Sequence, residues 1–161
     1  MMVAGQGNPA PLFGDDMRKI ELDTIEIAGE EYPIYCDLYV LSQIQERMSL
    51  NDFERKIIGA KIIRNDDGTP QYDENKRIKL EFDEYDINAL LLGLTYMVNE
   101  GLLIKSEQEG TEYEPFKSRQ LGSICDLSPT ELSSVVANAF NKCVVSKKKR
   151  QTKSQTRKKN T

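Results

Sequence analysis

The run DINALLLGLTYMVNEG, residues 86–101, decides the fold of this chain. Its apolar residues recur three and four positions apart, which is the spacing of one face of an α-helix. They are Ile87, Leu90, Leu91, Leu94, Met97 and Val98. Leu92 and Tyr96 widen this face, so we expect a central helix that other elements contact on several sides. Asp83 is the expected N-cap, and Gly101 is the expected end of the helix.

The segment before this run predicts a hairpin and two helices. Apolar and polar residues alternate over 20–27 and 32–36, and Gly29 lies between the two runs, which is typical of a β-hairpin. Pro33 lacks a backbone N–H and therefore predicts an edge or short second strand. A first helix is expected from about Asp37, and a second from an N-cap at Ser49 to a stop at Gly59.

The segment after residue 63 predicts less regular structure. Residues 64–77 are polar and are expected to form a loop or irregular hairpin, followed by a strand at 78–82. Residues 102–116 resemble a strand-like fragment and an acidic loop, and a short helix is considered at 117–122. The last helix opens with the capping box SPTE at 128–131. The whole pattern predicts an α+β fold, mostly helical, with an N-terminal β-hairpin followed by about four helices.

Charge divides the chain into a body and a tail. Residues 147–161 hold eight basic residues and no acidic one, whereas the rest holds 14 basic and 26 acidic residues. We therefore predict a disordered basic tail at 147–161 and a single globular helical domain at 18–146. Residues 1–17 are rich in glycine and proline and are predicted to be a disordered N-terminal segment.

Composition excludes several kinds of chemistry. The chain has no histidine, and its three cysteines are far apart, so Ser-His-Asp and Cys-His arrangements and the common zinc sites are excluded. We assign no catalytic, metal-binding or cofactor-binding residue and predict that the chain is not an enzyme. The alternative is an enzyme that uses carboxylates or lysine for catalysis. No run of 18 apolar residues and no secretory signal occurs, which predicts a cytoplasmic protein without a membrane partner.

Two groups of residues are candidates for partner binding. Tyr32, Tyr35 and Tyr39 cluster at the junction between the hairpin and the first helix. Tyrosine favours binding surfaces because it joins apolar area to a polar tip, although ordinary packing also explains such a cluster. The second group is the start of the basic tail: Lys147, Lys148, Lys149 and Arg150. This group would bind nucleic acid, contact an acidic protein surface, or simply solvate the tail.

Four strings resemble a known family in their order along the chain. They are IEIAGEEYPIYCDLY at 25–39, SQIQERM at 42–48, MVNEG at 97–101 and SPTEL at 128–132. In this layout residues 24–145 resemble the tail assembly chaperones of long-tailed, siphovirus-type bacteriophages and prophages of Gram-positive hosts. The resemblance rests on the order of elements and on short strings, and not on a chemical motif.

The resemblance implies a function. A chaperone of this family binds the tape measure protein and keeps it soluble while the tail tube assembles. Contact with the tail tube protein and self-association into oligomers would follow, in the host bacterial cytoplasm and outside the mature virion. The alternative is a small nucleic-acid-binding regulatory protein that uses the basic C-terminal tail, although the acidic body would repel a phosphate backbone.

Overall fold

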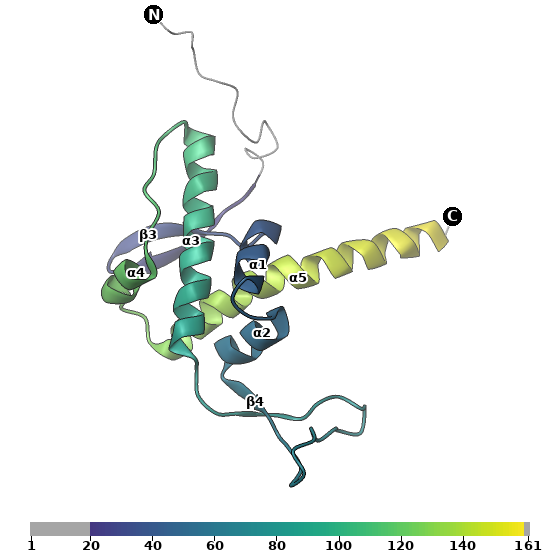
Figure 1. Cartoon of the computed structure of the whole chain (residues 1–161). Helices are drawn as coiled ribbons and strands as arrows, with labels where there is room; N and C mark the ends of the chain where they lie inside the picture. The colour runs from purple at the N-terminus through teal and green to yellow at the C-terminus, as the bar shows by residue number, and fades with distance from the viewer. Residues whose placement is uncertain (1–19, 160–161) are drawn as a thin grey trace, which may run out of the picture.

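The computed structural model describes residues 20–159, with side chains as far as Val145. The elements in chain order are β2 (Asp23–Ile27), β3 (Glu30–Ile34), α1 (Leu38–Gln45), α2 (Leu50–Ile58), β4 (Ala60–Ile62), β5 (Leu80–Phe82), α3 (Ile87–Glu109), α4 (Ser118–Ile124) and α5 (Pro129–Lys159). The predicted mostly helical α+β fold with an N-terminal hairpin is confirmed (Figure 1). The helices number five in this part of the chain, because the short α4 forms. The predicted disordered segment at residues 1–17 lies outside the described residues.

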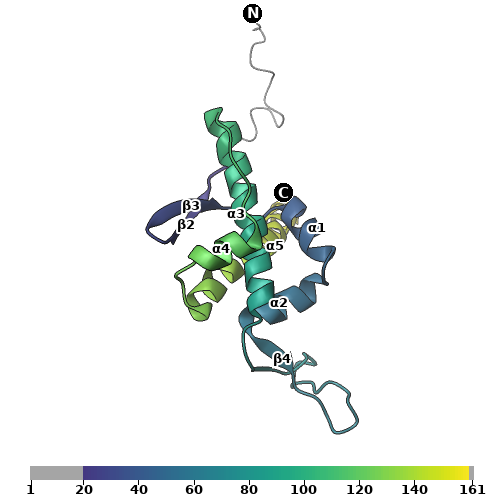
Figure 2. The ribbon, with the colours of Figure 1, turned by 60° about the vertical axis from the view of Figure 1, so that its left-hand side comes forward.

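Helix α3 is central, as its wide apolar face predicted. The β2–β3 hairpin and α4 lie on one side of it, α1 and α2 lie on the other, and α5 crosses it (Figures 1 and 2). Leu90, Leu94, Met97 and Val98 are fully enclosed by these neighbours. By length and composition α3 would also suit a membrane span, and half of that apolar stretch is buried inside the protein.

Both predicted ends of α3 were wrong. The N-cap is Asp86, whose carboxylate accepts a hydrogen bond from the Ala89 N–H at 3.0 Å. The helix passes Gly101 and ends at Gly110, which has a left-handed φ of 67°. Gly101 has a packing role, because a Cβ there would lie 2.7 Å from the backbone of Pro33. The predicted strand-like fragment after Gly101 is therefore the last part of α3.

The β2–β3 hairpin is packed on α3. Its turn residues Ala28 and Gly29 have φ values of 53° and 82°, as a two-residue hairpin turn that matches strand twist requires. Ile25, Ile27 and Ile34 are buried beneath it. Strand β3 pairs with β2 along one edge and rests against α3, which agrees with the short or edge strand that its proline predicted.

The predicted caps of the other helices are confirmed. The Ser49 hydroxyl accepts the Asp52 N–H at 3.1 Å at the start of α2, and Gly59 ends that helix with a φ of 73°. At the start of α5, Ser128 and Glu131 form a reciprocal capping box: each side chain accepts a hydrogen bond from the backbone N–H of the other. These local hydrogen bonds set where the helices begin and end.

The basic segment differs from its prediction. Helix α5 continues without a break to Lys159, where we expected a disordered tail from Lys147. No glycine or proline occurs between Thr130 and Lys159, and lysine, arginine and glutamine are good helix formers. The sequence therefore has no signal that ends α5 at the edge of the body. Residues 160–161 lie outside the described part of the chain.

The remaining excursion, residues 60–82, is here called the β4–β5 arm. Strands β4 and β5 pair antiparallel, and the irregular hairpin predicted between them is held by hydrogen bonds from the Ile63 N–H to the Lys79 carbonyl at 3.0 Å and from the Gln71 N–H to the Ile63 carbonyl at 2.9 Å. No residue from 61 to 84 is buried. The arm projects away from the helical body, beyond the start of α3 (Figures 1 and 2).

Candidate functional site

The candidate site is an open groove where the β2–β3 hairpin, the start of α1 and α5 meet. It encloses about 640 Å³. Its lining residues are Glu21, Asp23, Ile34, Tyr35, Cys36, Asp37, Leu38, Tyr39, Ala139, Lys142 and Cys143. Two of the three tyrosines that the sequence singled out, Tyr35 and Tyr39, therefore line one groove.

The chain is held tightly where it passes from β3 into α1. The Tyr35 N–H donates to the Met97 carbonyl of α3 at 3.0 Å. Two residues later the Asp37 carboxylate accepts the Val40 N–H at 3.0 Å and caps α1. These two bonds fix the backbone of this junction on both sides of Cys36, so the side chains that face the groove project from a rigid support. Leu38 and Tyr39, in the first turn of α1, are 64% and 61% exposed.

The opposite wall of the groove comes from α5. The Lys142 ammonium pairs with the Asp23 carboxylate at 2.6 Å, which joins α5 to the start of β2. Both side chains are more than half exposed, so the pair orients this edge of the groove and contributes little to stability. Ala139 lies one turn before Lys142 and adds apolar surface.

Two thiols lie together in the groove. Cys36 is buried and Cys143 of α5 is half-buried, and the two side chains are within hydrogen-bonding reach. Burial, and then the neighbouring Cys143 thiol, raises the pKa of Cys36 well above its usual value. At neutral pH Cys36 is therefore an uncharged thiol that acts as a small apolar side chain.

A carboxyl pair stands beside the groove. Burial, a hydrogen bond with Asp37 and the charge of Asp37 together raise the pKa of Glu100 to about 8. Glu100 is therefore protonated at neutral pH, and its hydroxyl donates to the Asp37 carboxylate. Burial, and then the charges of Glu100 and Tyr39, raises the pKa of Tyr113. No sequence pattern marks Glu100 and Tyr113, because they approach Asp37 and Tyr39 only when α3 and the loop after it fold against α1.

The third tyrosine lies elsewhere. Tyr32 is half-buried, its ring packs edge-on against Phe116 at 5.4 Å, and its hydroxyl donates to Glu30 at 3.1 Å. It does not line the groove, and its contacts fit the packing interpretation of the tyrosine cluster. Lys147, Lys148, Lys149 and Arg150 continue the backbone of α5 past the groove, and their side chains lie outside the described part of the structure.

The arrangement fits binding of a chain with apolar and basic side chains. Ile34, Cys36 and Ala139 give the groove an apolar part, and the phenol rings of Tyr35 and Tyr39 add flat apolar area with a polar tip. Glu21, Asp23 and Asp37 place carboxylates around the groove; Asp23 is paired with Lys142, and Asp37 caps α1 and shares a hydrogen bond with Glu100. Within residues 20–159, no three Cys, Asp or Glu side chains converge as a metal site would require.

Comparison with known proteins adds no relative. No family model matches the chain, and neither a curated protein nor a solved structure matches it.

Proposed function

We propose that this protein is a phage tail assembly chaperone that binds the tape measure protein and keeps it soluble during tail tube assembly. The observation that carries the proposal is the open groove between the hairpin, α1 and α5. Its apolar residues, two tyrosines and carboxylates would complement an amphipathic helix that carries lysine or arginine beside its apolar face. The order of elements, with a hairpin that leads straight into a helix, supports the same proposal.

The physical need for such a protein is clear. A very long amphipathic helix cannot bury its apolar face alone and therefore aggregates. Many copies of a small acidic protein would cover that face and keep the complex soluble through net charge. Each contact would be weak and the sum of contacts strong, so that tail tube subunits can displace the copies one by one. The protein would act in the host bacterial cytoplasm, associate with itself and be absent from the mature virion.

The test is co-expression with a phage tape measure protein, which is a very long helical chain. We expect the chain to raise the soluble fraction of that tape measure protein and to co-purify with it. A double variant, Leu38→Ser with Tyr39→Ser, should abolish co-purification, because both side chains are exposed at the groove. Circular dichroism of the variant should match that of the native chain.

A matched control separates groove binding from general stickiness. Ile124 of α4 is 38% exposed and does not line the groove, so Ile124→Ser should leave co-purification intact. The proposal is overturned if the tape measure protein is equally soluble without this chain and no complex is recovered. Loss of binding in both variants would instead place the contact outside the groove.

A second function is favoured by one observation. Helix α5 carries eight basic and no acidic residues from 147 to 159, a composition that suits contact with nucleic acid phosphates. As a small nucleic-acid-binding regulator, the chain would retain DNA or RNA in a manner that falls steeply with salt. Removal of residues 147–161 would abolish that retention and leave tape measure binding at the groove unchanged. The two functions are therefore distinguished by the same truncated chain.

A further inference from the structure

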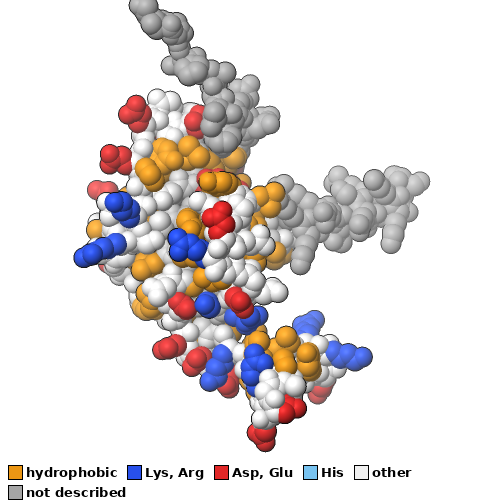
Figure 3. Space-filling model, in the orientation of Figure 1, with side chains coloured by type: hydrophobic (Ala, Val, Ile, Leu, Met, Phe, Trp, Pro, Cys, Tyr) orange, Lys and Arg blue, Asp and Glu red, His pale blue; other side chains and the backbone are white. Residues whose placement is uncertain are grey.

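The β4–β5 arm has one apolar face. In an antiparallel pair, directly opposed residues share a face and neighbours along a strand alternate between faces. The register pairs Ile62 with Leu80, and a further bridge pairs Tyr72 with Ile78. These four residues and Phe82 therefore lie on one side of the arm, whereas Lys79 and Glu81 point to the other. Figure 3 shows apolar side chains gathered on the arm beside basic ones.

Beyond the root of the arm, no described residue covers this face. Tyr72, Ile78, Leu80 and Phe82 are 57%, 42%, 45% and 66% exposed. Phe82 contacts Tyr85 at the root of the arm, with ring centroids 5.3 Å apart, and the rest of the face extends away from the body. A two-stranded hairpin is marginal by itself in water, so an apolar face of this kind is typical of a surface that another element packs on.

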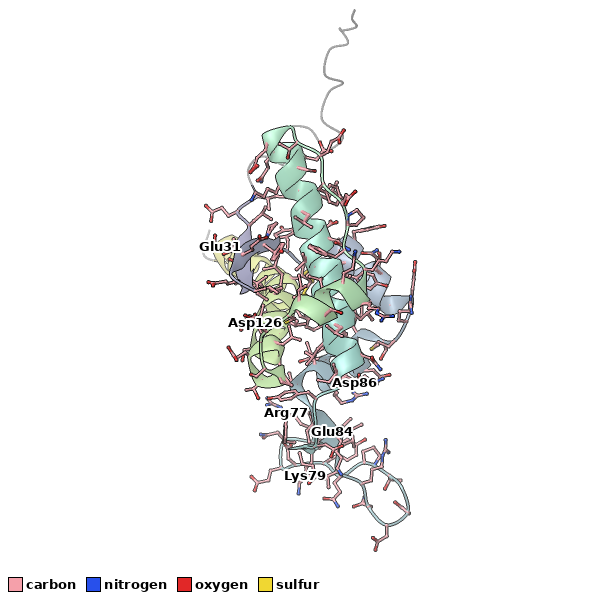
Figure 4. All side chains as sticks on the ribbon, turned by 90° about the vertical axis from the view of Figure 1, so that its left-hand side faces the viewer. Glu31, Arg77, Lys79, Glu84, Asp86 and Asp126 are labelled. Carbon is pink, nitrogen blue, oxygen red and sulfur yellow. The ribbon has the colours of Figure 1, made fainter. Side chains whose placement is uncertain are left out.

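Charge indicates which occupant fits. From Lys61 to Glu81 the arm holds five basic and five acidic residues and is neutral, whereas residues 1–60 and 82–146 together hold 9 basic and 21 acidic residues. The acidic bodies of two copies therefore repel each other except where the basic end of α5 meets them, and their arms can meet without a like-charge penalty. Figure 4 shows Arg77 and Lys79 out on the arm, far from Glu31 on the acidic first hairpin.

The available area is sufficient for such a contact. A tyrosine or phenylalanine carries about 150–250 Å² of surface, so the two exposed rings leave on the order of 100 Å² bare on each. With the two aliphatic residues, the face offers roughly 350 Å² of apolar surface per copy. Two such faces and a polar rim of ordinary proportion bury about 1,200–1,300 Å² in total, the lower end of specific interfaces.

We propose that the apolar face of the β4–β5 arm binds the same face of a second copy, in a two-fold symmetric contact. The same patch then serves both partners, as in an isologous dimer. The inference specifies the self-association included in the proposed function, and it places that contact away from the groove. A dimer formed through the arms leaves both grooves open, so one assembly offers two binding sites to the same long helix.

The first test is sedimentation velocity of the full chain alone over a wide concentration range. We expect a reversible dimer. Leu80→Lys should raise the dissociation constant of the dimer by about tenfold or more, because it buries a charge at the centre of the contact. Lys79→Ala, on the opposite face of the same strand, should leave dimerisation unchanged. Because no tape measure protein is present, this result is independent of the groove.

The second test does not depend on an equilibrium constant. Leu80→Cys should give a disulfide-linked dimer under mild oxidation, since residues near a two-fold axis meet their own copies, whereas Lys79→Cys and the native chain should not. A native chain that remains monomeric at all concentrations overturns the inference and leaves the groove proposal standing. A cross-link from the introduced thiol to Cys125 or Cys143 of another copy also overturns it, because the arm would then lie on a different surface.

Discussion

The two hairpins of this protein are built alike and used differently. The β2–β3 hairpin places Ile25, Ile27 and Ile34 in the hydrophobic core, and all three are buried. The β4–β5 hairpin also gathers its apolar residues on one face, but none of its residues from 61 onward is buried. An apolar face that the chain covers by itself stabilises the fold, whereas one that it leaves open is free to contact another molecule.

The cause of the difference lies in what stands opposite each hairpin. Gly101 of α3 has no side chain, and its backbone approaches Pro33 so closely that β3 lies directly on the helix. The arm has no such helix surface. Its root is closed by Gly59, where a Cβ would lie 2.8 Å from the Phe82 ring, and beyond this point the arm leaves the body. The comparison predicts unequal costs for equivalent substitutions.

The largest effect is expected inside the first hairpin. Ile27 has no exposed surface, so Ile27→Ala removes buried apolar area and leaves a cavity in the core. We expect a loss of about 2–5 kcal/mol in the free energy of unfolding, measured by urea denaturation. A loss below about 1 kcal/mol would mean that this hairpin is no better packed than the arm, and the contrast between them would disappear.

Gly101→Ala tests the close approach directly. Alanine is favoured over glycine in a helix by about 1 kcal/mol, so an open site would be stabilised. Here the added Cβ meets the Pro33 carbonyl at 2.7 Å, and the backbone cannot retreat without straining the bond from Tyr35 to Met97. We expect a net loss of about 1–3 kcal/mol, as for overpacked cores. Thermal unfolding of the variant would contradict this account if the midpoint rose.

Local signals in the sequence could be interpreted, whereas contacts between distant segments could not. The spacing of apolar residues in α3 and the capping box at Ser128 are local signals, and both predictions were confirmed. The glycine at position 101 predicted a helix end. Its actual role is a close contact with Pro33, a residue far back in the chain that no local pattern can reveal. The same limit applies to the groove. Tyr35 and Tyr39 lie close together in the sequence and could be singled out, but no local pattern brings Glu100 to Asp37.

Of the two strands in the β4–β5 arm, the sequence predicted only β5. Both strands have three residues. The alternation that begins at Ile78 predicted β5, whereas Ala60–Ile62 follows α2 directly and is followed by Ile63, so no alternating run marks β4. The basic, non-apolar composition of residues 147–161 predicts disorder, whereas α5 continues to Lys159, because lysine, arginine and glutamine are good helix formers. Whether a hairpin face is covered depends on which element lies over it, and that information is absent from the hairpin itself.

The pair of carboxyl groups, Glu100 and Asp37, predicts that the free energy of unfolding depends on pH. The folded-state pKa of Glu100, about 8, lies above its ordinary value of 4.5, so the native chain holds a proton that the unfolded chain has released between these pH values. The stability from this pair is complete below about pH 4.5 and is lost as the pH rises through 8. Glu100→Gln keeps a donor for Asp37 and should remove this slope.

The measurement compares urea denaturation of the native chain and Glu100→Gln from pH 5 to pH 9. Glu100 is only half-buried, so solvent screening limits the expected difference to the order of 1 kcal/mol in favour of the variant at the alkaline end. Other titrating groups cancel in the comparison. Parallel pH profiles for the two proteins would show that Glu100 does not share its proton with Asp37.

The smallest effect is expected on the arm. Leu80 is 45% exposed and has no buried residue beside it on β5, so Leu80→Ala should cost only about 0.5 kcal/mol in the unfolding of the dilute chain. The same substitution removes apolar area from the face proposed to bind a second copy, so its cost should increase with protein concentration as native dimers form. Thermal unfolding at low and high concentration measures both values. A cost that is large at every concentration would mean that the arm is packed in its own chain, and the distinction between the two hairpins would then fail.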